Sequence, residues 1–164
     1  MKALVLTSNS LRHEYFAKQI NENFSETVIL VEEKKNYYEN QKNNSLLINK
    51  HFEKIKLNEK KWFKVNNNIK AYFKLVEDIN NTNLFNWVMS QRFDVVCLFG
   101  TSILNETWIN EFPSRIINLH LGLSPYYRGS ATLFWPFANQ ELEYYQFQDF
   151  QKETVLVDNL HGKS

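Results

Sequence analysis

Apolar runs and stretches of helical spacing alternate along most of the chain. Four apolar runs predict strands, and they are KALVLTS at residues 2–8, ETVILVEE at 26–33, FDVVCLFG at 93–100 and RIINLH at 115–120. The third run is apolar throughout, which is typical of a parallel strand covered on both faces. We therefore expect a central sheet whose strands are separated by other elements.

Helical spacing fills much of the sequence between these strands. The predicted helices lie within residues 11–24, 44–63, 69–91, 101–112 and 130–140. Ser10 is placed to cap the first helix, the pair Asn80 and Asn81 can break the third, and Pro113 ends the fourth. Strands alternating with helices predict an α/β fold with an open, mostly parallel sheet.

Ligands of such sheets bind outside the carboxyl ends of the strands, so polar strand ends are the candidate functional positions. Polar residues follow three of the predicted strands, at residues 7–10, 100–102 and 118–120. Because parallel neighbouring strands end at the same edge, we expect these three segments to lie at one edge of the sheet.

Composition narrows the classes of function. A chain of 164 residues with 43% hydrophobic residues is long and apolar enough for one domain with its own core. The net charge of +1 argues against nucleic acid as the main partner, because phosphate binding needs a basic excess. Cys97 stands alone, so a disulfide framework is excluded and a reducing compartment is expected. Neither a signal peptide nor an apolar span of ~18 residues is recognisable, which predicts a cytoplasmic protein without a membrane partner.

Unusual backbone and polar chemistry coincide after the strand at 115–120. The chain has 4 glycines and 3 prolines, and two of each lie in IINLHLGLSPYYRGSATLFWPFANQE, residues 116–141. Asn118 and His120 are two residues apart, which puts both side chains on one side of a strand. An amide donor beside an imidazole can stabilise an oxyanion and move a proton, as acyl-type transfer requires. Taken alone, His120 also fits a structural hydrogen-bonding role.

This segment resembles the signature of the folate-dependent formyltransferases, Asn-x-His-x-(Ser/Gly)-x-x-Pro-x-(Tyr/Phe)-Arg-Gly. The matching residues stand at family spacing, and they are Asn118, His120, Pro125, Arg128 and Gly129. The opening LVLTSNSLRHEYFA is similar to the sugar N-formyltransferase branch, LFGTSIL also fits, and a methionyl-tRNA formyltransferase-like branch stays open. The resemblance covers residues 1 to about 144 and implies a Rossmann-like catalytic domain with flanking helices.

The resemblance also implies roles. The donor of the formyl group would be N10-formyltetrahydrofolate, as co-substrate, and no metal is implied. Catalysis would fall to Asn118 and His120, with a downstream Asp at the place of Asp158 orienting the imidazole. The pterin ring would lie along Phe99, Gly100, Ser102, Ile103 and Leu104. A substrate phosphate would meet the turn before the first helix and a distant arginine, that is Ser8, Asn9, Ser10, Arg12 and Arg128. A simple helix cap is the alternative for the turn, and bracing of a loop is the alternative for Arg128.

The family pattern stops after Tyr144. The relatives' Gly-x-Thr-x-His is absent from residues 145–164, which we interpret as a divergent tail behind a domain of residues 1–144. A frameshifted or truncated reading frame explains such a tail, and a genuine divergent ending that uses Asp158 is the alternative. In the first case the sheet is incomplete at its C-terminal side, with an exposed edge.

The sequence therefore predicts formyl transfer from N10-formyltetrahydrofolate to an amino group, with an aminodeoxy nucleotide sugar for surface polysaccharide as the expected acceptor. The alternative is an inactive remnant that keeps the fold and weak folate or nucleotide binding. Both readings name small molecules as ligands, argue against nucleic acid as the main partner, name no membrane partner, and leave a homodimer open.

Overall fold

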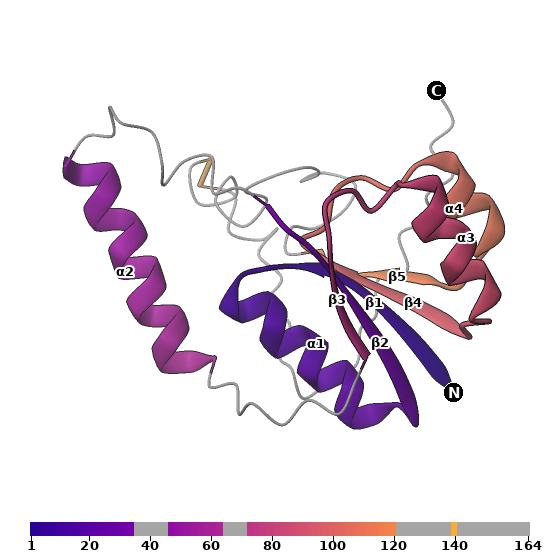
Figure 1. Ribbon diagram of the computed structural model, residues 1–164. Helices are drawn as coiled ribbons and strands as arrows, with labels where there is room; N and C mark the ends of the chain where they lie inside the picture. Colours follow the sequence, from indigo (N-terminus) through magenta and orange to yellow (C-terminus); the bar gives the residue numbers. More distant parts are fainter. Residues whose placement is uncertain (35–45, 64–71, 121–138, 141–164) are drawn as a thin grey trace.

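A parallel five-stranded sheet forms the centre of the protein. The computed structural model describes residues 1–34, 46–63, 72–120 and 139–140 (Figure 1). The strands run in the order β3-β2-β1-β4-β5 and all pair in parallel. Their bounds are Lys2–Ser8 for β1, Glu26–Glu32 for β2, Tyr72–Val76 for β3, Val95–Phe99 for β4 and Ile116–Asn118 for β5. The expected α/β fold with a mostly parallel sheet is confirmed.

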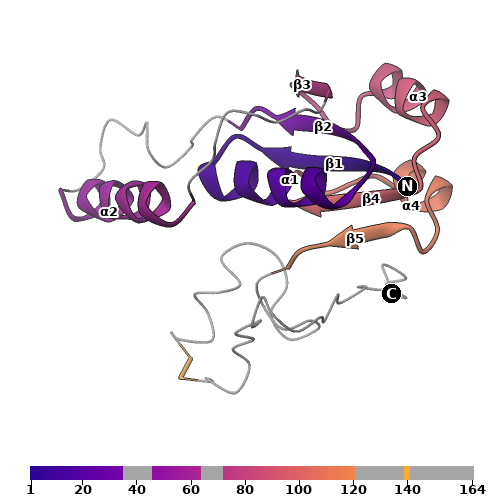
Figure 2. The same ribbon diagram turned by 90° about the horizontal axis from the view of Figure 1, so that it is seen from below.

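Helices connect the strands and cover the sheet. They are α1 (Leu11–Asn23), α2 (Leu46–Trp62), α3 (Thr82–Ser90) and α4 (Glu106–Glu111). Figures 1 and 2 show α1 beside the sheet, α3 next to α4, and α2 set apart beyond α1. An Arg12–Glu59 ion pair of 2.5 Å and a Tyr15–Phe63 ring contact of 5.4 Å connect α1 with α2 and the residue that follows it.

The two faces of the sheet carry separate hydrophobic clusters because successive side chains of a strand point to opposite faces. Leu4 and Leu6 of β1 pack in the cluster that contains the residues of α3 and α4, including the fully buried Trp108. Ala3 and Val5 pack in the cluster on the α1 side. Apolar strands covered on both faces are what parallel sheets require.

Cys97 belongs to the α1-side cluster. Its thiol is 3% exposed, as the sequence predicts. Burial raises the pKa of this thiol to about 11, so it stays protonated near neutral pH.

The helix predicted over residues 69–91 is partly wrong. The structure has the strand β3 at Tyr72–Val76, and α3 begins only at Thr82. Asn81 caps α3 by accepting hydrogen bonds from the backbone N–H groups of Asn83 and Leu84 at 3.0 and 3.1 Å. Upstream of this cap, pairing with β2 outweighs the helical spacing of a short apolar segment.

The strand order places a topological switch point between β1 and β4. From β1 the chain proceeds through β2 to β3 on one side, and from β4 to β5 on the other. Ligands of open α/β sheets bind outside the carboxyl ends of the strands at such a point. None of the described helices is long and apolar enough to cross a membrane. The predicted helix at 130–140 and the domain boundary at residue 144 rest on residues outside the described part.

Candidate functional site

The ends of β1 and β4 are joined by a side-chain hydrogen bond at the switch point. Thr7 lies opposite Phe99 in the register, and its Oγ1 donates to the Phe99 carbonyl at 2.8 Å. Thr7 is 1% exposed and the following Ser8 is 5% exposed. The bond satisfies a buried hydroxyl and holds the start of the segment predicted to line the pterin.

The segment between β4 and α4, residues 100–105, is called the β4–α4 turn. His13, on the first turn of α1, packs against the start of the β4–α4 turn. Its Nδ1 is 2.6 Å from Ser8 Oγ, and its ring meets Phe99 edge-on at a centroid distance of 4.5 Å. The side chain is buried and lies near two cations. Desolvation, followed by the charges of Arg12 and Lys34, lowers the His13 pKa to about 4. His13 is therefore a neutral packing and hydrogen-bonding group at pH 7.

Gly100 is required where β4 turns toward α4. Its φ of +76° lies in the left-handed region that side chains disfavour. A Cβ at this position would lie 2.3 Å from Cε1 of His13. The close approach of the His13 ring and the backbone conformation both disfavour a side chain here.

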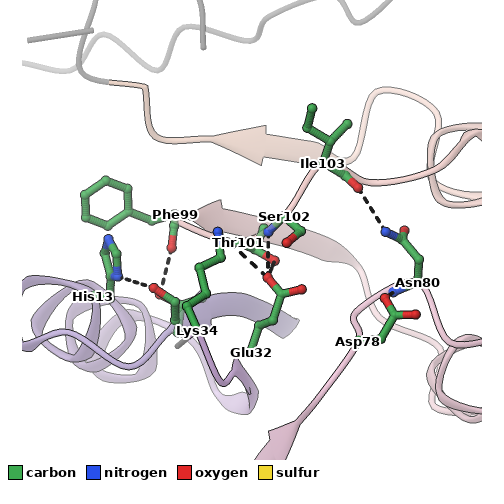
Figure 3. Close-up of polar contacts among 11 residues, drawn as sticks. His13, Glu32, Lys34, Asp78, Asn80, Phe99, Thr101, Ser102 and Ile103 are labelled. Carbon is green, nitrogen blue, oxygen red and sulfur yellow. Dashed lines mark hydrogen bonds and ion pairs between the residues drawn. The ribbon is translucent and has the colours of Figure 1, made fainter. Parts of the chain in front are cut away.

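Glu32, the last residue of β2, reaches the same turn from the other side of β1 (Figure 3). Its Oε2 accepts the backbone N–H of Ser102 at 2.6 Å and the hydroxyl of Thr101 at 3.2 Å. Lys34 Nζ lies 4.0 Å from the same oxygen. The carboxylate is 5% exposed, so these partners offset the cost of burying its charge.

The second half of the turn is held by Asn80, which follows β3. Its Nδ2 donates to the Ile103 carbonyl at 2.9 Å, and its Oδ1 accepts the N–H of Asn105 at 2.9 Å. The Ile103 side chain is 92% exposed and points away from these contacts (Figure 3), whereas Leu104 is buried in the core. Ile103 is thus an apolar side chain presented to solvent next to the expected pterin position.

The predicted phosphate-binding turn is brought to this edge of the sheet. Asn9 is exposed, and Ser10 occupies the N-cap of α1 with its carbonyl accepting the N–H of His13 and of Glu14. The Ser10 side chain makes no capping bond, and its Oγ is buried without a hydrogen-bond partner among the described residues. Arg12, the predicted phosphate ligand that follows the turn, forms an ion pair with Glu59 of α2. The predicted N-cap position of Ser10 is confirmed, although its backbone and not its side chain makes the capping hydrogen bonds.

Asn118 is the last residue of β5, and His120 follows it by two residues. Because β5 pairs with β4, this strand end neighbours the end of β4, where the turn begins. Asn118 ends β5 opposite Leu98 of β4, and the N–H of Leu119 donates to the Leu98 carbonyl at 2.9 Å. Both Asn118 and His120 are partly exposed. The predicted strand is shorter than expected and ends at Asn118. Two predicted site residues, Arg128 and Asp158, lie outside the described residues.

Sequence reasoning missed three residues at this site, namely His13, Glu32 and Asn80. Glu32 lies at the end of a predicted strand and His13 lies one turn into the helix after another, so position along the alternating pattern was the available signal for these two. Asn80 follows β3, for which the pattern predicts a helix, so no such signal pointed to it. No group of three or more His, Cys, Asp or Glu that could hold a metal ion occurs among the described residues.

Comparisons with known proteins extend the geometric picture. No protein-family model matches the chain, and no curated protein matches it either. Solved structures do match. Phosphoribosylglycinamide formyltransferase from Anaplasma phagocytophilum has 20% identity and a TM-score of 0.51 over 85% of this chain. The enzymes of that name from Brucella melitensis and Streptococcus pneumoniae TIGR4 have 13% and 16% identity and TM-scores of 0.52 and 0.53, each also over 85% of the chain.

The matched structures are longer than this chain. The alignments cover 58% of the Anaplasma protein, 66% of the Brucella protein and 67% of the Streptococcus protein. Many α/β proteins have a parallel sheet with a topological switch point, as this chain has between β1 and β4. The comparisons identify which of these folds the chain resembles. The protein has the fold of the phosphoribosylglycinamide formyltransferases over most of its length.

Proposed function

We propose that the protein is a formyltransferase that uses N10-formyltetrahydrofolate. The observation that carries this proposal is the position of Asn118, which ends β5 directly beside β4, within a fold found in formyltransferases. Residues 99–104 follow β4 at the same edge, where the sequence predicts the pterin. The Asn-x-His pair and the cofactor segment thus come from two adjacent strands.

The proposed chemistry needs few groups. The acceptor amine attacks the formyl carbon, and the new C–N bond forms as the carbonyl oxygen gains negative charge. The Asn118 amide donates to that oxygen, and an N–H of the His120 ring donates beside it. As the bond to N10 of the folate breaks, the proton lost by the amine passes to N10 through His120 or a water that it holds. Asp158 remains the predicted partner that orients the imidazole.

Two acceptors have support. The resemblance of the opening segment favours an aminodeoxy nucleotide sugar, whereas the structural neighbours are named for phosphoribosylglycinamide. Both molecules carry a primary amine and a phosphate. The start of α1, where Ser10 Oγ is buried without a partner among the described residues, is the proposed phosphate position.

The test is an assay of the full chain with N10-formyltetrahydrofolate and each acceptor in turn, with tetrahydrofolate and formylated product followed by chromatography. We expect product with at least one acceptor and none without acceptor. Folate binding without turnover for any amine would establish the alternative, a remnant that keeps the fold and the cofactor site. A folded chain that neither binds formyl-folate nor transfers the formyl group refutes the proposal.

A further inference from the structure

The β4–α4 turn is held by strands that do not pair with β4. In the sheet β4 pairs with β1 and β5, yet the turn after it is bound by Glu32 of β2 and by Asn80 after β3. Glu32 reaches across the end of β1, because Ser8 lies opposite Glu32 and Thr7 lies opposite Phe99. Two distant parts of the sheet therefore converge on one short segment (Figure 3).

The hydrogen bond from the Ser102 N–H to Glu32 fixes the orientation of the Thr101–Ser102 peptide. Glu32 is 5% exposed, and burying its polar oxygens costs free energy unless they accept hydrogen bonds; both hydrogen bonds to Oε2 come from the turn. A peptide is planar and trans, so the carbonyl of Thr101 points opposite to the Ser102 N–H, away from Glu32. Moving the turn would leave the buried charge without its main partners.

We propose that Glu32 is a positioning residue that holds the Thr101–Ser102 peptide in the orientation needed to bind the pterin ring of the formyl donor. This inference rests on the proposed function. The ring of a pterin carries N–H donors, and the orientation of this peptide presents the Thr101 carbonyl as an acceptor on the side away from Glu32. The exposed Ile103 next to it offers apolar contact.

A different role is typical of an acid at the end of the second strand. In dinucleotide-binding folds that acid accepts hydrogen bonds from a ribose. Here the carboxylate is occupied by its own chain, through Ser102 and Thr101. The turn after β1, SNS at residues 8–10, also lacks the glycines that let a pyrophosphate approach. The geometry therefore favours an internal support over a ribose ligand.

The experiment compares wild type with Glu32→Ala, Glu32→Gln and Glu33→Gln. Glu33 is the adjacent, exposed control. Binding of 5-formyltetrahydrofolate, a stable formylated folate, is measured by calorimetry, and exchange of the Ser102 amide hydrogen is measured by NMR. In Glu32→Ala we expect fast exchange at Ser102 and a Kd raised about tenfold to a hundredfold, since misplacement of a binding group by about 1 Å has effects of that size.

Glu32→Gln keeps an oxygen that accepts the Ser102 N–H, so it should retain most of the amide protection and bind within a few-fold of wild type. Glu33→Gln should match wild type. A residue important only for stability would lower the melting temperature in both Glu32 variants without separating their Kd values. Should Glu32→Ala not fold, Glu32→Met takes its place, because methionine keeps most of the side-chain volume and removes the acceptor for the Ser102 N–H.

Three outcomes overturn the inference. One is a folded Glu32→Ala that binds the probe as tightly as wild type. Another is slow Ser102 exchange in that variant, which would show that the turn holds its shape unaided. The third is binding of NAD by wild type that Glu32→Gln abolishes, which would make Glu32 a ribose ligand. If wild type binds no formyl-folate, the proposed function fails and the pterin role fails with it, while Ser102 exchange still reports whether Glu32 holds the turn.

Discussion

The end of the sheet at β1 and β4 differs sharply from its β3 edge. Of the five buried polar or charged side chains in the described part, four lie at the first region, namely Thr7, Ser8, His13 and Glu32. At the β3 edge the apolar side chains are the anomaly, because Phe73 and Leu75 are 54% and 55% exposed. One region buries polar groups, and the other leaves apolar groups in water.

Burying a polar group costs free energy unless the group finds a hydrogen-bond partner. A concentration of buried polar groups in one region therefore indicates that the region serves a function as well as folding. The partners at β1 and β4 fix the backbone of a turn, whereas the exposed side chains Phe73 and Leu75 of β3 are apolar and have no hydrogen-bonding groups to offer. We therefore expect substitutions to act on function and shape at the first region and to be tolerated at the second.

The largest expected effect is on catalysis. Asn118→Ala should lower kcat/KM by about 10²–10³-fold, because removal of one oxyanion donor costs about 3–4 kcal/mol in the transition state. Asn110→Ala, an exposed asparagine of α4, is the matched control and should leave the rate unchanged. Steady-state assays with saturating folate measure both. Equal rates for the two variants would remove Asn118 from the mechanism.

Gly100→Ala tests the turn itself. We expect a loss of about 3 kcal/mol in the free energy of unfolding, since a side chain with positive φ costs about 1–2 kcal/mol and overpacking a further 1–3. Urea denaturation measures this. Adding His13→Ala should recover part of the loss by removing the ring that the new methyl group meets. Strict additivity of the two changes would show that the ring and the turn are independent.

His13 predicts a pH dependence of stability. Its pKa is about 4 in the folded protein and near 6.5 when unfolded, so the unfolded state takes up a proton first as the pH falls. The contribution of the neutral His13 ring to the free energy of unfolding is fully present above about pH 6.5 and is lost as the pH falls toward 4. Between about pH 7 and about pH 5 the loss should be about 2 kcal/mol.

The measurement is a series of urea denaturation curves across this range for wild type and for His13→Gln. The difference between the two proteins isolates the histidine from the other titrating groups. Parallel pH profiles would contradict the burial of a neutral His13 beside Arg12 and Lys34.

The smallest effect is expected at the β3 edge. Phe73→Thr should change the free energy of unfolding by less than about 0.5 kcal/mol, because the ring is half exposed and threonine suits a strand. Leu30→Ala, in the fully buried interior of β2, is the contrasting variant and should cost about 2–5 kcal/mol. A large loss from Phe73→Thr would mean that Phe73 is covered in solution.

The sequence predicts the repeated pattern of the fold well and its contacts poorly. Runs such as ETVILVEE and FDVVCLFG identify β2 and β4 because burial on both faces leaves a long apolar signature. For β3 the pattern predicts a helix, because YFKLV is short and lies in a longer stretch of helical spacing, and only its pairing with β2 decides. Likewise, nothing local shows that Glu32 bonds a residue 70 positions away. Such contacts depend on strand order, which the pattern leaves open.

Strand order also determines when the site can form as the chain is made. β1 is synthesised first, yet its partner β4 comes about ninety residues later, as the Thr7–Phe99 bond with its separation of 92 shows. Until then one edge of β1 is an unpaired apolar strand, the kind of surface on which nascent chains aggregate. The centre of the sheet is thus closed only after β2 and β3 have been made, and a pause in translation before residue 95 would prolong the exposure of β1.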